Sequence, residues 1–347
     1  MVENWVREAE LLVEEVLDRA AGEVDRSGVI PASHFDALAE RGFYGFPLSA
    51  GMTPGTLIDT AATLIGGCLA TGFVWAQHLG ALRAVAFADN AALRERYLAR
   101  MTAGTYRCGV SYAGARSAPT LFAEAVEGGM AISGTAPFVT GWEYVDAVVV
   151  SVRITRNGSE SIATVLVPTQ DLGGVEVERI PLIAADASAT VRITFDRAFV
   201  ADEHIIGVKS LGEFRSGRGS LTDWINGALA LGVLSRCVRE LNGLGIDAYD
   251  ARYASLRERF ATVMGDAEAT YALRADIAQT AVLAAAAGVV ATGSRATLAH
   301  TTAERLMRQA SFALVCTTRE PIKDALLDRL RPAELGREHG REAVGRT

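Results

Sequence analysis

The chain has 347 residues, half of them apolar, with a formal net charge of −7 and a mean hydropathy of +0.20. This length predicts about two or three domains with large apolar cores, and a negative charge without a basic run excludes nucleic-acid binding as the main function. Four scattered cysteines without a C-x-x-C pair, Cys68, Cys108, Cys237 and Cys316, are typical of reduced thiols in a cytoplasm rather than of a metal site.

The N-terminal third of the chain has the apolar spacing of α-helices. Trp5, Leu12 and Val16 recur at helical intervals, so we expect them on one buried face. The segment that contains them is acidic and amphipathic, which argues against an ordinary signal peptide. Further along, Ser33 is the predicted N-cap of another helix and Gly42 its predicted end.

The middle third changes to the two-residue alternation of β-strands. Its β-branched runs are separated by Asn-Gly and Gly-Gly turns, which are typical connections between strands. Four or more strands within about 100 residues predict a β-sandwich or barrel. The predicted strands are residues 147–154, 162–168, 175–182 and 190–200.

Helical spacing returns in the last third, in long segments rich in Ala, Leu and Arg. The most apolar segment, residues 281–293, has about 13 residues, whereas a membrane span needs about 20. Its Ala and Gly content predicts a buried helix with close neighbours. The whole chain therefore has an α–β–α order: an N-terminal helical domain (1–105), a central β domain (106–209), a C-terminal helical bundle (210–335) and a frayed polar tail (336–347).

This order resembles the acyl-CoA dehydrogenase family, whose members have a helical N-terminal domain, a central β domain and a C-terminal four-helix bundle. In the β domain, the segment GVSYAGARSA is similar in length and spacing to the family's flavin loop, C-x-T-E-P-x-x-G-S-D. The resemblance implies that Val110, Ser111 and Ser117 hold FAD through backbone groups and hydroxyls. Tyr112 and Ala113 stand where the family has Glu-Pro.

A second segment, ISGTAPFVTGWEYVDAVVV, looks like the family's L-x-G-x-K-x-x-I-T-N-x-x-x-A-D. The resemblance implies that Phe138 lies beside the isoalloxazine ring and that Thr140 places a hydroxyl near the reactive edge of the ring, where it can hydrogen-bond the reduced flavin. Trp142 has two readings, a buried aromatic that packs the turn or a wall of the ligand site. For His78 we favour a hydrogen-bonded core histidine over a site residue.

The catalytic base of the family is displaced in this chain. Abstraction of an α-proton from an acyl thioester needs a nearby carboxylate with a raised pKa. When Arg308 is aligned with the arginine of the family's M-R-D-A, the base position falls on Thr317, whose hydroxyl cannot do this work. The candidate bases are Glu320, on the same loop, and Asp223, at the start of the bundle. Their alternative readings are a solvated loop charge and a helix N-terminal acid.

The family's R-x-x-F-G motif, which holds the adenine and pyrophosphate of a neighbouring subunit's FAD, is also missing, and Arg257 and Arg259 read as solvated helix charges. The leading hypothesis is an acyl-CoA dehydrogenase-like flavoprotein that oxidises acyl-CoA or a carrier-bound acyl thioester at the α,β-bond, with hydride transfer to FAD. The resemblance implies a cytoplasmic homo- or hetero-oligomer, a dimer of dimers, with an electron-accepting flavoprotein as a further partner.

Two other functions stay open. The chain could be the non-catalytic subunit of a heterotetrameric acyl-CoA dehydrogenase, because Thr317 and the missing R-x-x-F-G are what a degenerate partner would show. It could also be a flavin-dependent hydroxylase or tailoring enzyme on the same fold, which needs no α-proton base. Whether the chain is itself an enzyme is therefore an open question at the level of its sequence.

Overall fold

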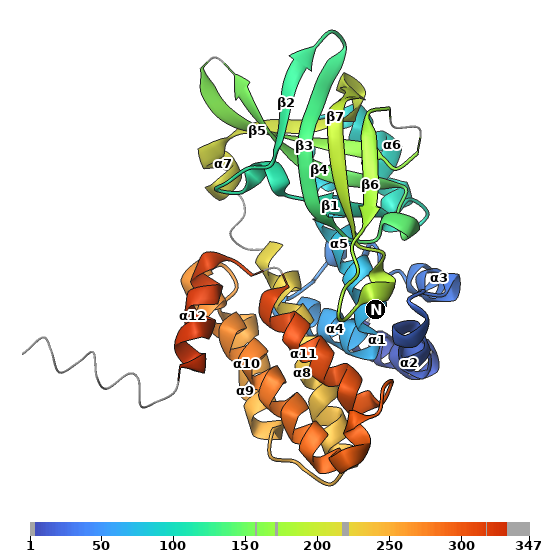
Figure 1. The fold of residues 1–347 in the computed structure, drawn as a ribbon. Helices are drawn as coiled ribbons and strands as arrows, with labels where there is room; N and C mark the ends of the chain where they lie inside the picture. The colour runs from blue at the N-terminus through green and yellow to red at the C-terminus, as the bar shows by residue number, and fades with distance from the viewer. Residues whose placement is uncertain (1–3, 157, 171–172, 217–221, 317, 332–347) are drawn as a thin grey trace, which may run out of the picture.

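Helices from both ends of the chain pack together beside one central sheet (Figure 1). The computed structural model describes residues 4–156, 158–170, 173–216, 222–316 and 318–331. Short helical turns are labelled η. The N-terminal part contains α1 (Trp5–Leu12), η1 (Val13–Leu17), α2 (Asp18–Ser27), α3 (Ala32–Glu40), η2 (Phe46–Leu48), α4 (Pro54–Gly67), α5 (Leu69–Ala86) and α6 (Ala91–Thr102).

The first buried face departs from the predicted spacing after one helix. Trp5 and Leu12 are buried on α1, as predicted, but Val16 is only half-buried. The reason is the π-helical turn η1, which adds one residue to the turn. Leu17, at 0% exposure, therefore takes the core position that the regular period assigns to Val16.

The predicted limits of α3 are correct at one end. Gly42 adopts a φ of +73°, and its N–H donates to Ala39 while the N–H of Phe43 donates to Leu38, which is a Schellman cap. The predicted start is wrong. Pro31 is the N-cap residue and Ser33 lies inside the helix, because the extended conformation of Pro31 lets the helix begin at Ala32.

The central part forms one eight-stranded sheet, in the order β6-β7-β3-β2-β4-β5-β8, with β1 parallel to β4. The apolar side chains of β2, β3, β4, β5 and β7 meet in one core, so the predicted sandwich or barrel is one continuous sheet around a single apolar interior. Its elements are β1 (Cys108–Ser111), η3 (Ala113–Ala115), β2 (Leu121–Val126), β3 (Gly129–Val139), η4 (Trp142–Tyr144), β4 (Ala147–Arg156), β5 (Ser159–Pro168), β6 (Val175–Arg179), η5 (Asp186–Ser188), β7 (Val191–Ala201), η6 (Asp202–His204) and β8 (Ile205–Ser210).

The C-terminal part is a helical bundle in which α10 packs against α8, α11 and α12 (Figure 1). By length and composition alone, Ala267–Thr297 could cross a membrane, with 33% of its apolar window buried; core helices of soluble proteins pass the same test. Its helices are α7 (Leu211–Ser216), α8 (Thr222–Gly243), α9 (Asp250–Thr262), α10 (Ala267–Thr292), the turn η7 (Gly293–Thr297), α11 (Thr302–Val315) and α12 (Glu320–Leu330).

The apolar segment 281–293 forms the last turns of α10. Ala281, Ala284 and Ala285 are buried, as predicted, whereas Val290 is 80% exposed. A Cβ atom placed on Gly288 would meet nothing within 4 Å. The prediction of a buried helix with close neighbours is therefore correct for the first turn of this segment and wrong for the last.

The two helical parts share one apolar core that runs from Trp5 to Leu326. At its centre α4 crosses α8 so closely that a Cβ atom on Gly232 would lie 2.7 Å from the carbonyl oxygen of Ala62 and 3.0 Å from the side chain of Ile65. Glycine is needed at this crossing because any side chain would push the helices apart. The N-terminal helices and the bundle are thus fixed to each other through backbone contact.

This crossing predicts opposite effects for two glycine substitutions. Alanine favours a helix over glycine by about 1 kcal/mol, so Gly288→Ala should raise the free energy of unfolding slightly. Gly232→Ala should lower it by about 1–3 kcal/mol, because the added methyl group overpacks the crossing. Urea unfolding of both variants beside the unmodified chain measures the difference. Equal stability of the two variants would contradict the close crossing.

Candidate functional site

The predicted cofactor-binding residues come from two segments that meet at one end of the sheet. Val110 and Ser111 lie on β1, and Thr140 follows β3. The segments touch at Gly109, where a Cβ atom would lie 3.1 Å from the carbonyl oxygen of Thr140. The same end of the sheet is held against α5, since a Cβ atom on Gly141 would lie 3.1 Å from a methyl group of Val74.

A β-bulge exposes Phe138 at this end of β3. The pairing between β3 and β7 shifts between Ala136 and Val139, and Pro137 lies inside the shift. Proline has no N–H for the ladder and is tolerated at such a bulge, which also changes the direction of the side chains. Phe138 is consequently 59% exposed, whereas Val139, the next residue, is fully buried.

Thr140 belongs to a row of three buried hydroxyls. Its Oγ1 lies 3.2 Å from Oγ1 of Thr190, which lies 3.0 Å from Oγ of Ser188. The side chains are 6%, 2% and 0% exposed, in that order. The N–H of Gly141 donates to Ser188 at 2.8 Å, and that of Trp142 donates to Ala189 at 3.2 Å. The sequence did not indicate Thr190 and Ser188 as site residues, because neither lies in a segment with a recognisable motif and both meet Thr140 only in the folded chain.

The loop that carries Ser188 holds two strained residues. Ala185 and Ala189, on either side of η5, have φ values of 55° and 49°, in the left-handed region that costs L-residues free energy. Both alanines are buried. Such strain persists where surrounding contacts fix the backbone, and here the contacts are those with the segment after Thr140.

The loop that carries Ser117 is anchored by a buried arginine. Arg153, 5% exposed, donates through Nε to the carbonyl of Gly114 at 3.1 Å and through Nη2 to that of Arg116 at 2.9 Å. Its Nη1 pairs with Glu160 at 2.9 Å. Ser117 itself is exposed, while Val110 and Ser111 are buried at 8% and 5%. Sequence reasoning missed Arg153, although a single arginine within a run of β-branched residues can indicate a buried arginine that anchors a neighbouring segment.

His78 is a core residue, which confirms the favoured reading. Its Nδ1 accepts the N–H of Cys108 at 3.1 Å, and its Nε2 lies 3.1 Å from the carbonyl oxygen of Met101. A carbonyl can only accept, so the proton is on Nε2. Burial lowers the pKa of His78 to about 3, so the ring stays neutral and ties α5 to β1. Trp142 is half-buried and packs against the core of the sheet, in agreement with the first of its two readings.

The candidate bases lie on the bundle. Glu320 is the first residue of α12; its side chain is 80% exposed and its carboxylate lies 3.7 Å from Nζ of Lys323. Asp223 lies in the first turn of α8, where its side chain is outside the described part of the structure, and Thr317 is outside the described residues altogether. The assignment of a base therefore stays a prediction. Within the described residues, no group of three or more His, Cys, Asp or Glu side chains could hold a metal ion.

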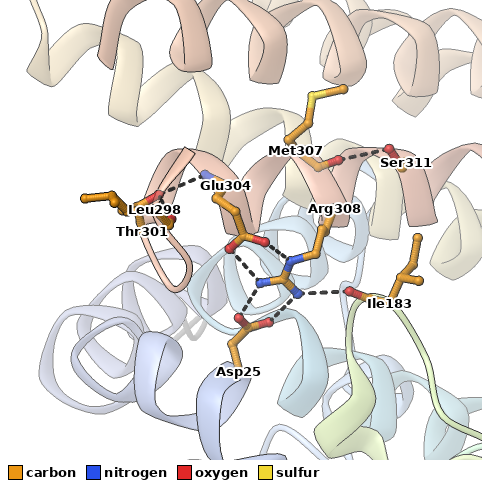
Figure 2. A network of polar contacts seen from close by, with 8 residues as sticks. All are labelled: Asp25, Ile183, Leu298, Thr301, Glu304, Met307, Arg308 and Ser311. Atoms are coloured by element: carbon orange, nitrogen blue, oxygen red, sulfur yellow. Dashed lines mark hydrogen bonds and ion pairs between the residues drawn. The ribbon is translucent and has the colours of Figure 1, made fainter. Parts of the chain in front are cut away.

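Arg308 joins three parts of the chain (Figure 2). It donates to both carboxylate oxygens of Asp25 on α2, at 3.1 and 2.6 Å, to the carbonyl of Ile183 at 2.9 Å, and to Glu304 one turn earlier on α11. The hydrogen bonds to Glu304 and Asp25 raise the pKa of Arg308. Thr301 caps α11 by accepting the N–H of Glu304, which fixes the start of this helix.

The expected solvated arginines of the bundle behave differently from each other. Arg259 is 51% exposed, as predicted. Arg257 is not a free surface charge: it donates to both carboxylate oxygens of Asp59 at 2.5 Å and so joins α9 to α4. The side chain of Arg257 is 48% exposed, as predicted, but its pairing with Asp59, 198 positions away in the sequence, was not predicted.

Solved structures match nearly the whole chain at low sequence identity. Butyryl-CoA dehydrogenase from Megasphaera elsdenii has a TM-score of 0.77 at 15% identity, covering 94% of this chain and 97% of that one. A glutaryl-CoA dehydrogenase from Mycobacterium smegmatis in complex with FADH2 has a TM-score of 0.78 at 13% identity, covering 94% and 93%. FkbI, for biosynthesis of the methoxymalonyl extender unit of Fk520, has a TM-score of 0.74 at 21% identity, covering 92% and 98%.

No protein-family model matches the chain, and no curated protein matches its sequence. The similarity is therefore one of structure. The helical N-terminal part, central sheet and C-terminal helices are those of the acyl-CoA dehydrogenase fold, and the resemblance seen in the sequence is confirmed at this level.

His78 predicts a pH dependence of stability. Between its pKa of about 3 in the folded chain and the ordinary value of 6.5, only the unfolded chain binds the proton, so this contribution to stability is lost as the pH falls. From pH 7 to about 5, unmodified protein should lose roughly 2 kcal/mol more than His78→Asn. Urea unfolding at the two pH values measures this, with His300→Asn as an exposed control that keeps the full loss. An equal loss in all three proteins would show that His78 titrates normally.

Arg308 predicts a stability effect that a surface arginine does not share. Arg308→Met leaves the carboxylate of Asp25, 11% exposed, without its bidentate partner, so the free energy of unfolding should fall by about 1–3 kcal/mol. Arg7→Met removes an exposed pair with Glu10 and should cost less than about 0.5 kcal/mol. Chemical denaturation compares the two, and similar small losses would mean that Arg308 does not hold the three segments together.

Proposed function

We propose that this chain, which has the acyl-CoA dehydrogenase fold, is a flavoprotein that binds FAD at the Thr140 end of the central sheet and oxidises an acyl thioester. The observation that carries the proposal is the pair formed by Phe138 and Thr140. An exposed apolar ring at a bulge, two residues from a buried hydroxyl, fits a flat aromatic ring with hydrogen-bond acceptors on its edge. FAD would supply the hydride acceptor.

The remaining predicted contacts fit the same group. The loop after β1 is fixed on the sheet by Arg153, so the backbone at Val110 and Ser111 and the exposed hydroxyl of Ser117 are offered from a rigid support. The neighbour crystallised with FADH2 supports this placement by its fold. Because the chain lacks R-x-x-F-G, a charged partner for the diphosphate would come from elsewhere, and we propose a second chain of a homo- or hetero-oligomer.

Asp223 is the stronger of the two candidate bases. A general base for an α-proton needs desolvation to raise its pKa, and Glu320 is 80% exposed and paired with Lys323. Asp223 lies on α8, whose following residue, Trp224, is 3% exposed and contacts Phe46 in the shared core. We therefore assign proton abstraction to Asp223 and keep Glu320 as the comparison.

A tailoring reaction is the second candidate function, and the similarity to FkbI favours it, because that protein has the highest identity of the three neighbours described above. A reaction that begins with reduced flavin and oxygen needs no α-proton base, which agrees with Thr317 at the family's base position. The substrate would then be a carrier-bound or free acid derivative instead of a fatty acyl-CoA.

One experiment separates these functions. The full chain is purified, loaded with FAD and mixed anaerobically with a panel of acyl-CoAs while flavin absorbance is followed. We expect bleaching in the unmodified chain and in Glu320→Gln, and bleaching slowed about a hundredfold or more, with the bound-FAD spectrum intact, in Asp223→Asn.

Each other result points to a different function. A chain that takes up no FAD alone but co-purifies with a longer relative that does would be a non-catalytic subunit. Bound FAD that no acyl-CoA bleaches, together with oxygen consumption after chemical reduction, would favour the tailoring reaction.

A further inference from the structure

The hydrogen bonds in the row of hydroxyls formed by Ser188, Thr190 and Thr140 have a preferred donor order. Each hydroxyl has one O–H to donate and lone pairs to accept. Among the residues that the structure describes, neither Ser188 nor Thr190 has a side-chain hydrogen bond outside the row. Both are almost fully buried, at 0% and 2% exposure, whereas Thr140 retains 6%. Thr140 is therefore the least buried member of the row.

Three donor orders are conceivable, and only one leaves the unused O–H on Thr140, the least buried of the three residues. If Thr140 donates to Thr190 and Thr190 to Ser188, the O–H of Ser188 is buried without an acceptor. If Thr190 accepts from both neighbours, its own O–H is buried without one. A buried donor without a partner is costly. In the remaining order Ser188 donates to Thr190, Thr190 donates to Thr140, and the O–H of Thr140 is left to donate to a group outside the row.

The backbone keeps the row in register. The carbonyls of Ser188 and Ala189 accept the N–H groups of Gly141 and Trp142, so the two segments cannot slide past each other. The left-handed Ala185 and Ala189 flank η5, which carries Ser188. These contacts explain why the loop accepts two strained residues.

We propose that Thr190, supported by Ser188, is a positioning residue that fixes the Thr140 hydroxyl as an outward hydrogen-bond donor toward an acceptor on the flavin ring. This inference rests on the proposed function for its flavin part, while the donor order rests on this chain alone. It separates the roles of the hydroxyls: Thr140 touches the ligand, and Thr190 acts only through Thr140. The two parts can be tested separately.

The first test uses the chain without FAD and compares unfolding equilibrium constants. Thr140→Val leaves the O–H of Thr190 without an acceptor, and Thr190→Val does the same to Ser188, so both constants should rise about tenfold. Ser188→Ala removes only the first donor and should stay within about threefold of the unmodified chain. Thr60→Val is the matched control: the Thr60 hydroxyl on α4 is buried without a hydrogen-bond partner among the described residues, so the constant should not rise. A larger effect for Ser188→Ala than for Thr140→Val would reverse the donor order and overturn the inference.

The second test uses the FAD-loaded chain. Thr190→Val should weaken FAD binding about fivefold to tenfold, and a tenfold selective loss for reduced flavin would lower its two-electron midpoint potential by about 30 mV. Thr190→Ser restores the hydroxyl. It should therefore return the FAD dissociation constant to within about twofold of the original and the midpoint potential close to its original value. The double variant Thr140→Val/Thr190→Val should bind FAD no more weakly than Thr140→Val alone.

The two tests keep the inference apart from the proposed function. Additive losses in the double variant, or no recovery in Thr190→Ser, would show that Thr190 acts through the general structure and would overturn its positioning role. If the unmodified chain binds no FAD although the unfolding constants follow the predicted order, the donor order stands, and both the flavin function and the role of Thr190 toward flavin are rejected.

Discussion

The guanidinium group of Arg308 is the contact on which the arrangement of the candidate site depends. It lies where α11 from the C-terminal bundle, α2 from the N-terminal helices and the loop before β7 converge. Two carboxylates neutralise it, and the carbonyl of Ile183 takes a remaining N–H. Charge-assisted, bidentate bonds of this kind are directional as well as strong, so they fix the position of the loop relative to α2 and α11.

From Ile183 the loop continues through η5 to the row of hydroxyls, so the loop is fixed at both of its ends. One end of the loop is fixed to the bundle by Arg308, and the other end is fixed to the strand end at Thr140 by Ser188 and Thr190. The strained Ala185 and Ala189 lie between these two anchors. The position of the Thr140 hydroxyl is therefore determined by contacts of the helical parts as well as of the sheet.

Patterns that depend on neighbouring residues could be predicted from the sequence, and those that depend on distant ones could not. The four alternating runs became β4, β5, β6 and β7, since alternation is a property of a single strand between a core and a surface. His78 was correctly placed in the core, because its flanking residues are apolar. The π-turn at Val13–Leu17, the partner of Arg257 and the hydroxyl of Thr190 escaped prediction, because each is decided by packing between segments far apart in the chain. The sequence alone could not decide between Asp223 and Glu320 as the base, because the burial of a carboxylate depends on such distant contacts.

The candidate site thus consists of two halves with different structural origins. The hydroxyl half, with Phe138 and Thr140, belongs to the sheet and its flanking loop, and Arg308 of the bundle anchors that loop at Ile183. The two candidate bases lie on α8 and at the start of α12, on separate elements. Because the proposed base and the proposed flavin contacts are carried by different elements, the base can differ between proteins of this fold while the row of hydroxyls keeps its geometry. This separation gives a physical reason why butyryl-CoA dehydrogenase and a protein for extender-unit biosynthesis can share one fold.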